Sequence, residues 1–123
     1  LIENAELSIN EWRKQRDIQK NKEQEELLSL GFSTFYLNRT NRSGIINAGV
    51  IGGINQDGNY LMNCRFNKKK LIVKIKNIAN KKKQINLYNI DAIQLIEKLQ
   101  NNKKKIRYFI LTHLITSKQG LCI

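Results

Sequence analysis

Proline is absent from this chain of 123 residues, which also has only two cysteines and one histidine. Cys64 and Cys122 lie far apart without a Cys-x-x-Cys spacing. With His113 as the single histidine, a zinc site and a cysteine–histidine nucleophile pair are excluded. No run approaches the roughly 18 to 20 apolar residues of a membrane span, and the first residues do not resemble a secretion signal. We therefore expect a cytoplasmic protein with reduced thiols and no membrane contact.

Acidic residues are scarce as well. Ten Asp and Glu stand against 22 Lys and Arg, so the formal net charge is +12 and the pI is near 9.9. Each phosphate that a Lys or Arg neutralises releases counterions, so this charge favours a polyanionic partner such as nucleic acid. An alternative stays open: AT-rich codons encode Lys, Asn and Ile, and the lysines then only cover a solvated face. The hydrophobic share of 41% indicates one domain with a modest core.

Helices are predicted for the first part of the chain. Residues 5–30 are rich in Glu, Gln, Lys and Leu with scattered apolar anchors, which is typical of one or two helices, and Gly31 is predicted to end the last. The run FSTFYL, Phe32–Leu37, is too short for periodicity to separate a strand from a buried helix. A glycine-containing loop follows, and GNYLMNCRF, residues 58–66, alternates loosely like a strand.

Residues 67–111 predict a helix and then a strand–helix–strand unit. Asn67 is expected to cap a helix with one apolar and one lysine face. QINLY, Gln84–Tyr88, is suited to a buried strand, Asp91 is expected to cap the next helix, and IRYFIL, residues 106–111, is a second strand. Such a parallel unit binds its ligand at the carboxyl ends of the strands.

Five blocks of the sequence resemble the middle of bacterial and phage DNA adenine methylases, which methylate the exocyclic amine of adenine. They are GFSTFYLNRTNRSGI, GVIGG, GNY, RFNKKKLI and INLYNIDAIQLI, within the span from about Trp12 to Leu111. The resemblance implies an α/β fold: a partial Rossmann-like methyltransferase sheet with a helical, loop-rich target-recognition portion. Residues 1–66 would be the recognition portion, and residues 67–123 the incomplete βαβ portion with an altered tail.

The same resemblance implies a DNA-binding loop. An arginine fork can hold a phosphate or two acceptors of guanine, and a methylase must extrude adenine from the duplex while something steadies the gap. Asn38 and Arg39 would shape the loop, and the residues after them would face DNA. Tyr60 would stack or contact phosphate, unless it is an ordinary strand tyrosine. The DNA-binding candidates are Asn38, Arg39, Thr40, Asn41, Arg42, Ser43, Gly44 and Tyr60.

The resemblance also implies S-adenosylmethionine as cofactor, contacted by Tyr88, Asn89 and Asp91, although Asp91 also suits a plain helix cap. The glycine-rich cofactor motif and the catalytic Asp-Pro-Pro-Tyr motif of these enzymes do not occur in the sequence. Codons can be chosen for the tail THLITSKQGLCI that give Asp-Pro-Pro-Tyr in a shifted frame. We therefore hypothesise that a one-base frameshift after Leu111 replaced the motif, and we assign no catalytic or metal-binding residue.

Three functions stay open from the sequence. The first is a fragment of a site-specific DNA adenine methyltransferase, inactive alone, from a system that can include a restriction endonuclease. The second is a small basic nucleic-acid-binding module without catalysis. The third is a helical interaction protein whose lysines are solvated.

Overall fold

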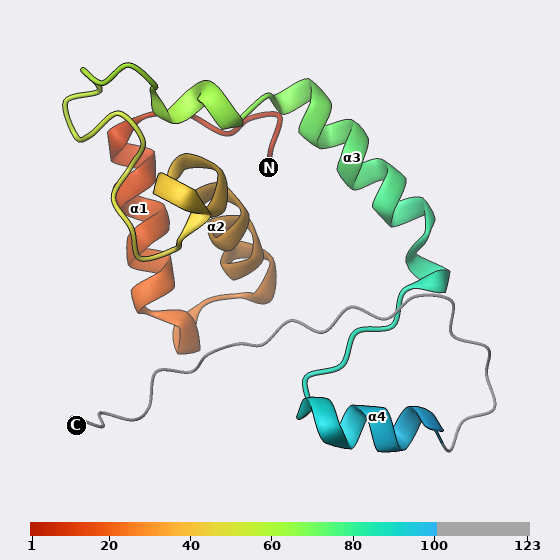
Figure 1. Ribbon diagram of the computed structural model, residues 1–123. Coiled ribbons are helices and arrows are strands. Elements are labelled where there is room, and N and C mark those ends of the chain that lie inside the picture. Colours follow the sequence, from red (N-terminus) through yellow and green to blue (C-terminus); the bar gives the residue numbers. More distant parts are fainter. Residues whose placement is uncertain (101–123) are drawn as a thin grey trace, which may run out of the picture. The chain divides into compact units, whose positions relative to one another are not determined.

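The computed structural model describes residues 1–100 and divides the chain into two units, residues 1–82 and residues 83–123 (Figure 1). The described part is mainly helical. Each unit has its own set of contacts, so the two are considered separately below.

The first unit is built on a helical hairpin. Helix α1 spans Ile9–Lys20 and helix α2 spans Leu27–Thr40, with a short 3-10 turn, η1 (Lys22–Gln24), between them. The two helices lie side by side in Figure 1. The hydroxyl of Ser8 accepts a hydrogen bond from the backbone N–H of Glu11 at 3.2 Å, so Ser8 caps α1.

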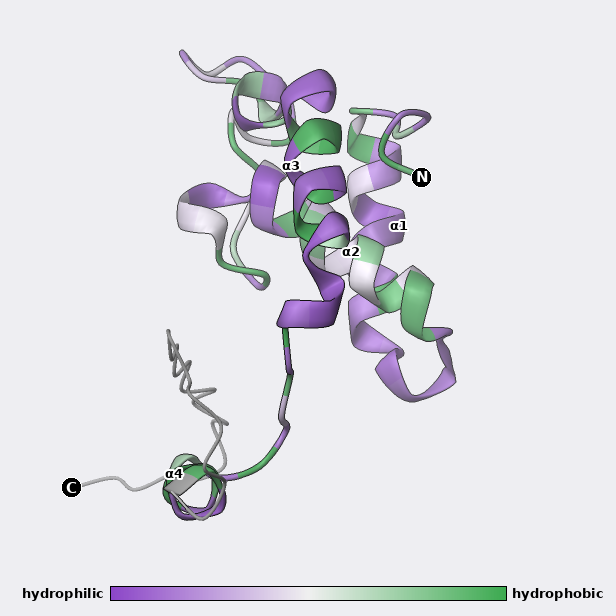
Figure 2. Ribbon diagram, turned by 90° about the vertical axis from the view of Figure 1, so that its right-hand side faces the viewer, coloured by the Kyte–Doolittle hydropathy of each residue, from purple (hydrophilic) through white to green (hydrophobic). Residues whose placement is uncertain are grey.

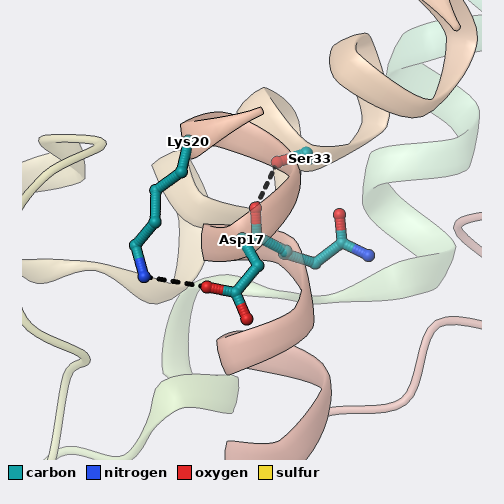
Figure 3. Close-up of polar contacts among 4 residues, drawn as sticks. Asp17, Lys20 and Ser33 are labelled. Atoms are coloured by element: carbon teal, nitrogen blue, oxygen red, sulfur yellow. Dashed lines mark hydrogen bonds and ion pairs between the residues drawn. The ribbon is translucent and has the colours of Figure 1, made fainter. Parts of the chain in front are cut away.

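A polar seam joins α1 to α2. The Ser33 hydroxyl, fully buried, donates to the backbone carbonyl of Gln15 at 2.7 Å, as Figure 3 shows. The amide of Gln19 donates to the hydroxyls of Ser33 and Thr34 at 3.1 and 2.9 Å. Figure 3 also shows the exposed ion pair between Lys20 and Asp17, whose N and O atoms lie 2.8 Å apart. The buried Ser33 hydroxyl thus has a backbone partner, whereas the side-chain oxygen of Gln15 is buried without a partner among the described residues.

The core of the first unit gathers around Tyr36. Its ring lies 5.5 Å from that of Phe66 and 6.0 Å from that of Phe32, between ring centroids, and its hydroxyl donates to the Glu6 carbonyl at 2.9 Å. Burial raises the pKa of Tyr36 to about 12, and the nearby carboxylates of Glu11 and Glu6 add to the rise. The buried apolar residues are Ala5, Trp12, Tyr36, Leu37, Val50, Met62, Phe66 and Leu71.

After α2 the chain is irregular and then helical again. Two 3-10 turns, η2 (Arg42–Gly44) and η3 (Met62–Arg65), precede helix α3 (Lys68–Asn80). The Asn67 side chain accepts from the backbone N–H of Lys70 at 3.0 Å, which confirms Asn67 as the predicted cap. Leu71 joins the core, whereas the rest of α3 is mostly exposed.

The second unit is described for residues 83–100. A 3-10 turn, η4 (Lys82–Gln84), begins at the boundary, and helix α4 spans Ala92–Gln100. The Asp91 carboxylate accepts from the backbone N–H of Ile93 at 2.8 Å, so the predicted cap is confirmed. Viewed end-on in Figure 2, α4 is apolar on one side and hydrophilic on the other. Leu95 is the one buried apolar residue among residues 83–99.

The predicted α/β fold with a partial Rossmann-like sheet is wrong. Residues 1–100 contain no strand, and their only β pairing is an isolated antiparallel bridge between Asn41 and Val50. Residues 85–89 have no regular structure, and Leu87 is 91% exposed rather than buried in a strand. A strand needs a partner for its backbone groups, and this segment has none among the described residues. The predicted strand over residues 106–111 lies outside the described residues.

Two local predictions were also wrong. Gly31 does not end a helix but lies inside α2, which continues through Phe32–Leu37. The segment over residues 58–66 forms an irregular loop and the turn η3 rather than a strand. Across the described residues, every helix is too short or too polar to cross a membrane.

Candidate nucleic-acid interface

The residues that resemble the methylase DNA loop form a closed loop at the end of α2. We call residues 41–50 the arginine loop; it is the yellow segment in Figure 1. Its two ends pair through the bridge between Asn41 and Val50, and the Arg42 N–H donates to the Gly49 carbonyl at 3.0 Å. Just beyond, the Ile51 N–H donates to the Thr40 carbonyl at 2.8 Å. The loop is therefore closed at its base by backbone hydrogen bonds.

The side chain of Asn41 holds the loop from inside. It is fully buried, and its amide nitrogen donates to the backbone carbonyls of Ile45 and Ile46 at 2.9 and 2.8 Å. Its oxygen accepts from the indole N–H of Trp12 on α1 at 2.6 Å. Arg16 in turn lies over the Trp12 ring, 5.0 Å from its centroid. One amide thus ties the loop to the hairpin, and removing it would leave buried groups without partners.

The turn of the loop depends on two residues with left-handed backbone. Ser43 has φ 54° and Gly44 has φ 71°. The Asn38 side chain donates to the Gly44 carbonyl at 3.0 Å, and a Cβ on Gly44 would lie only 3.0 Å from the Asn38 amide nitrogen. Glycine at position 44 therefore permits both the backbone angle and the close approach of Asn38.

Arg42 and Arg39 have different surroundings. Arg42 is exposed at the start of the loop, next to the exposed Ser43 and Ile45. Arg39 is half-buried in the last turn of α2, with its guanidinium carbon 5.9 Å from the centroid of Phe35. Its Nε is buried and has no hydrogen-bond partner among the described residues. Arg39 therefore carries a charge into the base of the loop, and Arg42 presents one at its surface.

The eight DNA-binding candidates are not equally accessible. Thr40 and Asn41 are fully buried, and the Thr40 hydroxyl donates to the Tyr36 carbonyl at 3.0 Å. In this conformation their side chains support the loop and do not reach the surface. Asn38, Arg42, Ser43 and Tyr60 are exposed, whereas Arg39 and Gly44 are partly so. The first seven candidates lie together at the end of α2, and Tyr60 belongs to the next loop.

The next loop, residues 51–62, is built around Gln56, and we call it the Gln56 loop. The amide nitrogen of Gln56 donates to the carbonyls of Ile51 and Gly53 at 2.8 and 2.7 Å, and its oxygen accepts from the Met62 N–H at 3.0 Å. A Cβ on Gly52, where φ is 86°, would lie 2.8 Å from the carbonyl oxygen of Tyr60. The loop is therefore compact, with Tyr60 74% exposed.

Sequence reasoning missed Trp12 and Gln56 as supports of these loops. Trp12 was expected only as an apolar anchor of a helix, and it is 29 residues from its partner Asn41. No local pattern reports a contact over that separation. For Gln56, the flanking glycines at 52, 53 and 58 indicated a turn, but not which side chain its backbone wraps around.

Charge is divided unevenly along the first unit. Seven of the ten acidic residues of the chain lie within residues 1–26, whereas residues 27–82 contain ten Lys and Arg and one acid, Asp57. Among the described residues the ion pair is Lys20 with Asp17, on α1, so none of those ten cations is in a described ion pair. Eight of the ten lie in residues 65–82, so α3 and the turn before it are the strongly basic part of the unit, and such a charge attracts a polyanion.

The cofactor candidates lie on the second unit without a sheet around them. Tyr88, Asn89 and Asp91 are exposed, with the Tyr88 ring 5.4 Å below the Lys98 ammonium and Asp91 occupied as a cap. The described residues of this segment build no strand, and therefore no crevice at the carboxyl ends of strands. Within residues 1–100, no cluster of three or more His, Cys, Asp or Glu side chains could hold a metal ion.

Comparison with known protein families, with curated proteins and with solved structures found no match to this chain. The methylase resemblance therefore rests on the quoted sequence blocks alone. The geometry of the two loops does not depend on that resemblance.

Proposed function

We propose that this chain is the DNA-recognition part of a DNA adenine methyltransferase, and that its first unit binds double-stranded DNA through the arginine loop. The observation that carries this proposal is the placement of Arg42. It stands exposed on a loop that Asn41 and backbone pairing hold in one shape, and the lysine-rich helix α3 belongs to the same unit. A preformed basic loop binds phosphate without an ordering cost.

The two arginines take different roles in this proposal. Arg42 contacts the duplex, either a phosphate or the two acceptors of a guanine. Arg39, half-buried with an unpartnered Nε, adds positive potential at the base of the loop and orients a phosphate there. Thr40 and Asn41 act indirectly, because they keep the loop in place from the interior.

Salt-dependent DNA binding tests the proposal. We would measure binding of the full chain to an adenine-containing duplex by fluorescence anisotropy over a series of salt concentrations. Affinity should fall steeply with salt, and Arg42→Ala should weaken binding severalfold and lower the salt slope by about one. Arg13→Ala removes an exposed arginine from α1 and serves as the matched control. Equal effects of the two substitutions, or binding that ignores salt, would contradict the proposal.

The charge and the loop equally support a non-catalytic nucleic-acid-binding module. The two candidates differ in catalysis: in the first the chain is part of a methyltransferase, and in the second it only binds nucleic acid. We propose that S-adenosylmethionine is the methyl donor of that enzyme, acting in the cytoplasm, where a restriction endonuclease can recognise the same site. The present sequence lacks the Asp-Pro-Pro-Tyr motif, so we expect no methyl transfer from this chain alone.

Restoring the motif separates these two candidates. Insertion of one base directly after the Leu111 codon should place Asp-Pro-Pro-Tyr there if the frameshift hypothesis holds. Transfer of labelled methyl groups to duplex adenine by the restored product would favour the methyltransferase. A coding sequence without that motif in any frame would remove the frameshift hypothesis and favour the binding module.

A further inference from the structure

Between Arg42 and Arg65 the chain contains no lysine or arginine, although two arginines, Arg39 and Arg42, come just before this interval and residues 65–82 after it are strongly basic. The Gln56 loop fills most of this interval. Asp57 is its single charged residue, and its exposed polar side chains include Asn55 and Asn59. A segment without cations contributes little to phosphate binding, so its place inside a DNA-binding surface needs another explanation.

The Gln56 loop is organised in the same way as the arginine loop. Each loop is organised by one amide side chain that makes three hydrogen bonds, Asn41 in the first and Gln56 in the second. The Gln56 loop also starts where the arginine loop closes, at the bond from the Ile51 N–H to the Thr40 carbonyl. The two preformed loops therefore adjoin each other at the end of α2.

Asn55 and Asn59 have unused hydrogen-bonding groups. Neither side chain makes a hydrogen bond to another described residue, in contrast to Asn38 and Asn41, which bind backbone carbonyls. Both are exposed. An asparagine amide offers one donor and one acceptor side by side, and this pair matches the ring nitrogen and exocyclic amine of adenine in the major groove.

We propose that the Gln56 loop reads base edges, with Asn55 and Asn59 recognising adenine, while the arginine loop next to it holds the backbone. This inference rests on the proposed DNA-binding function and adds to it a preference for particular base sequences. Gln56 is a positioning residue, because it fixes the loop without reaching the ligand. The division of labour follows the general pattern in which phosphate contacts set affinity and base contacts set sequence preference.

The test compares sequence preference with general affinity. Duplexes with randomised positions are selected on the wild-type full chain, and binding to the selected and the random duplex is then measured at one salt concentration. The double variant Asn55→Ala/Asn59→Ala should reduce the preference ratio about tenfold or more. Its binding to random duplex should change less than about twofold, because no cation is removed. Asn10→Ala, an exposed asparagine on α1, is the matched control.

A modified base tests directly whether Asn55 and Asn59 contact adenine. Replacing adenine by 7-deazaadenine removes the ring nitrogen acceptor, so the wild type should lose preference for the selected duplex and the double variant should not respond. Gln56→Leu should lose the preference as well, although Asn55 and Asn59 are still present. A double variant that keeps the wild-type preference, or a wild type without preference, overturns this inference alone. Absence of any salt-dependent binding overturns the proposed function itself.

Discussion

The two units of this chain use similar apolar residues and bury them very differently. In the first unit Tyr36 and Leu37 are fully buried, in a core that gathers residues from the N-terminal segment, both hairpin helices, a loop and α3. In the described part of the second unit, Leu87 is 91% exposed and Ile93 68% exposed. The comparison teaches that an apolar run becomes core only where other elements supply a surface to cover it.

The largest expected difference between the units concerns two leucines. Leu37→Ala should lower the free energy of unfolding by about 2 to 5 kcal/mol, because it opens a cavity in the core. Leu87→Ala should change it by less than about 0.5 kcal/mol, because its side chain is already exposed. Urea denaturation followed by far-UV circular dichroism, which reports the helices of both units, measures both. A comparable loss at Leu87 would mean that the second unit buries this side chain in solution.

A second pair compares asparagines. Asn41→Ala should cost about 2 kcal/mol, because the Trp12 indole N–H and the carbonyls of Ile45 and Ile46 lose their buried partner. Asn89→Ala, at an exposed position, should have almost no effect. In a double-mutant cycle, Asn41→Ala with Trp12→Phe should show coupling. Strict additivity would show that the indole and the amide do not interact.

The third pair compares tyrosines as a function of pH. The pKa of Tyr36 is raised to about 12, from 10.0 for a free tyrosine, so the folded state binds its proton more tightly than the unfolded state does. Stability from this group is fully present below about pH 10 and is lost as the pH rises toward 12. Relative to Tyr36→Phe, the wild type should lose about 1 to 1.5 kcal/mol between pH 8 and pH 11.

Tyr88→Phe is the control for that titration, because Tyr88 is 45% exposed and lies in the second unit. It should keep the wild-type pH dependence of unfolding. If Tyr36→Phe also keeps the wild-type pH dependence, ionisation of the buried Tyr36 hydroxyl is not the cause of the lower stability at alkaline pH.

The smallest effects are expected at the two helix caps. Asn67→Ala should lower global stability by about 0.5 to 1 kcal/mol, because α3 contributes Leu71 to the core. Asp91→Ala should reduce the helicity of α4 without a change in the global unfolding transition. Backbone chemical shifts measure the local effect, and thermal unfolding measures the global one. A lower midpoint of thermal unfolding for Asp91→Ala would contradict this, because it would show that α4 contributes to the stability of the first unit.

The same contrast explains what could be predicted from sequence. The caps Asn67 and Asp91 were predicted correctly because a cap and its helix are adjacent in the chain. The predicted strand over Gln84–Tyr88 was wrong because a strand depends on a partner elsewhere. Helix α2 was missed in part because its buried face alternates apolar residues with hydroxyls, at helical spacing: Ser33, Tyr36, Leu37 and Thr40.

The candidate site was predictable to a similar degree. The block FYLNRTNRSGI marked the position of the arginine loop, and the glycine at 44 does have the positive φ that its residue type permits. Which of its side chains face outward was not predictable. The burial of Thr40 and Asn41 follows from their contacts with Tyr36 and Trp12, and those contacts exist only after the hairpin has folded.

The central claim is that the first unit holds duplex DNA at its two loops. Titration of the labelled chain with duplex DNA, followed by two-dimensional NMR, tests this most directly. We predict that signals of Arg42, Ser43 and residues of the Gln56 loop shift, and that those of Arg13 and Lys14 on α1 do not. Shifts centred on α1, or no shift at low salt, would contradict the account.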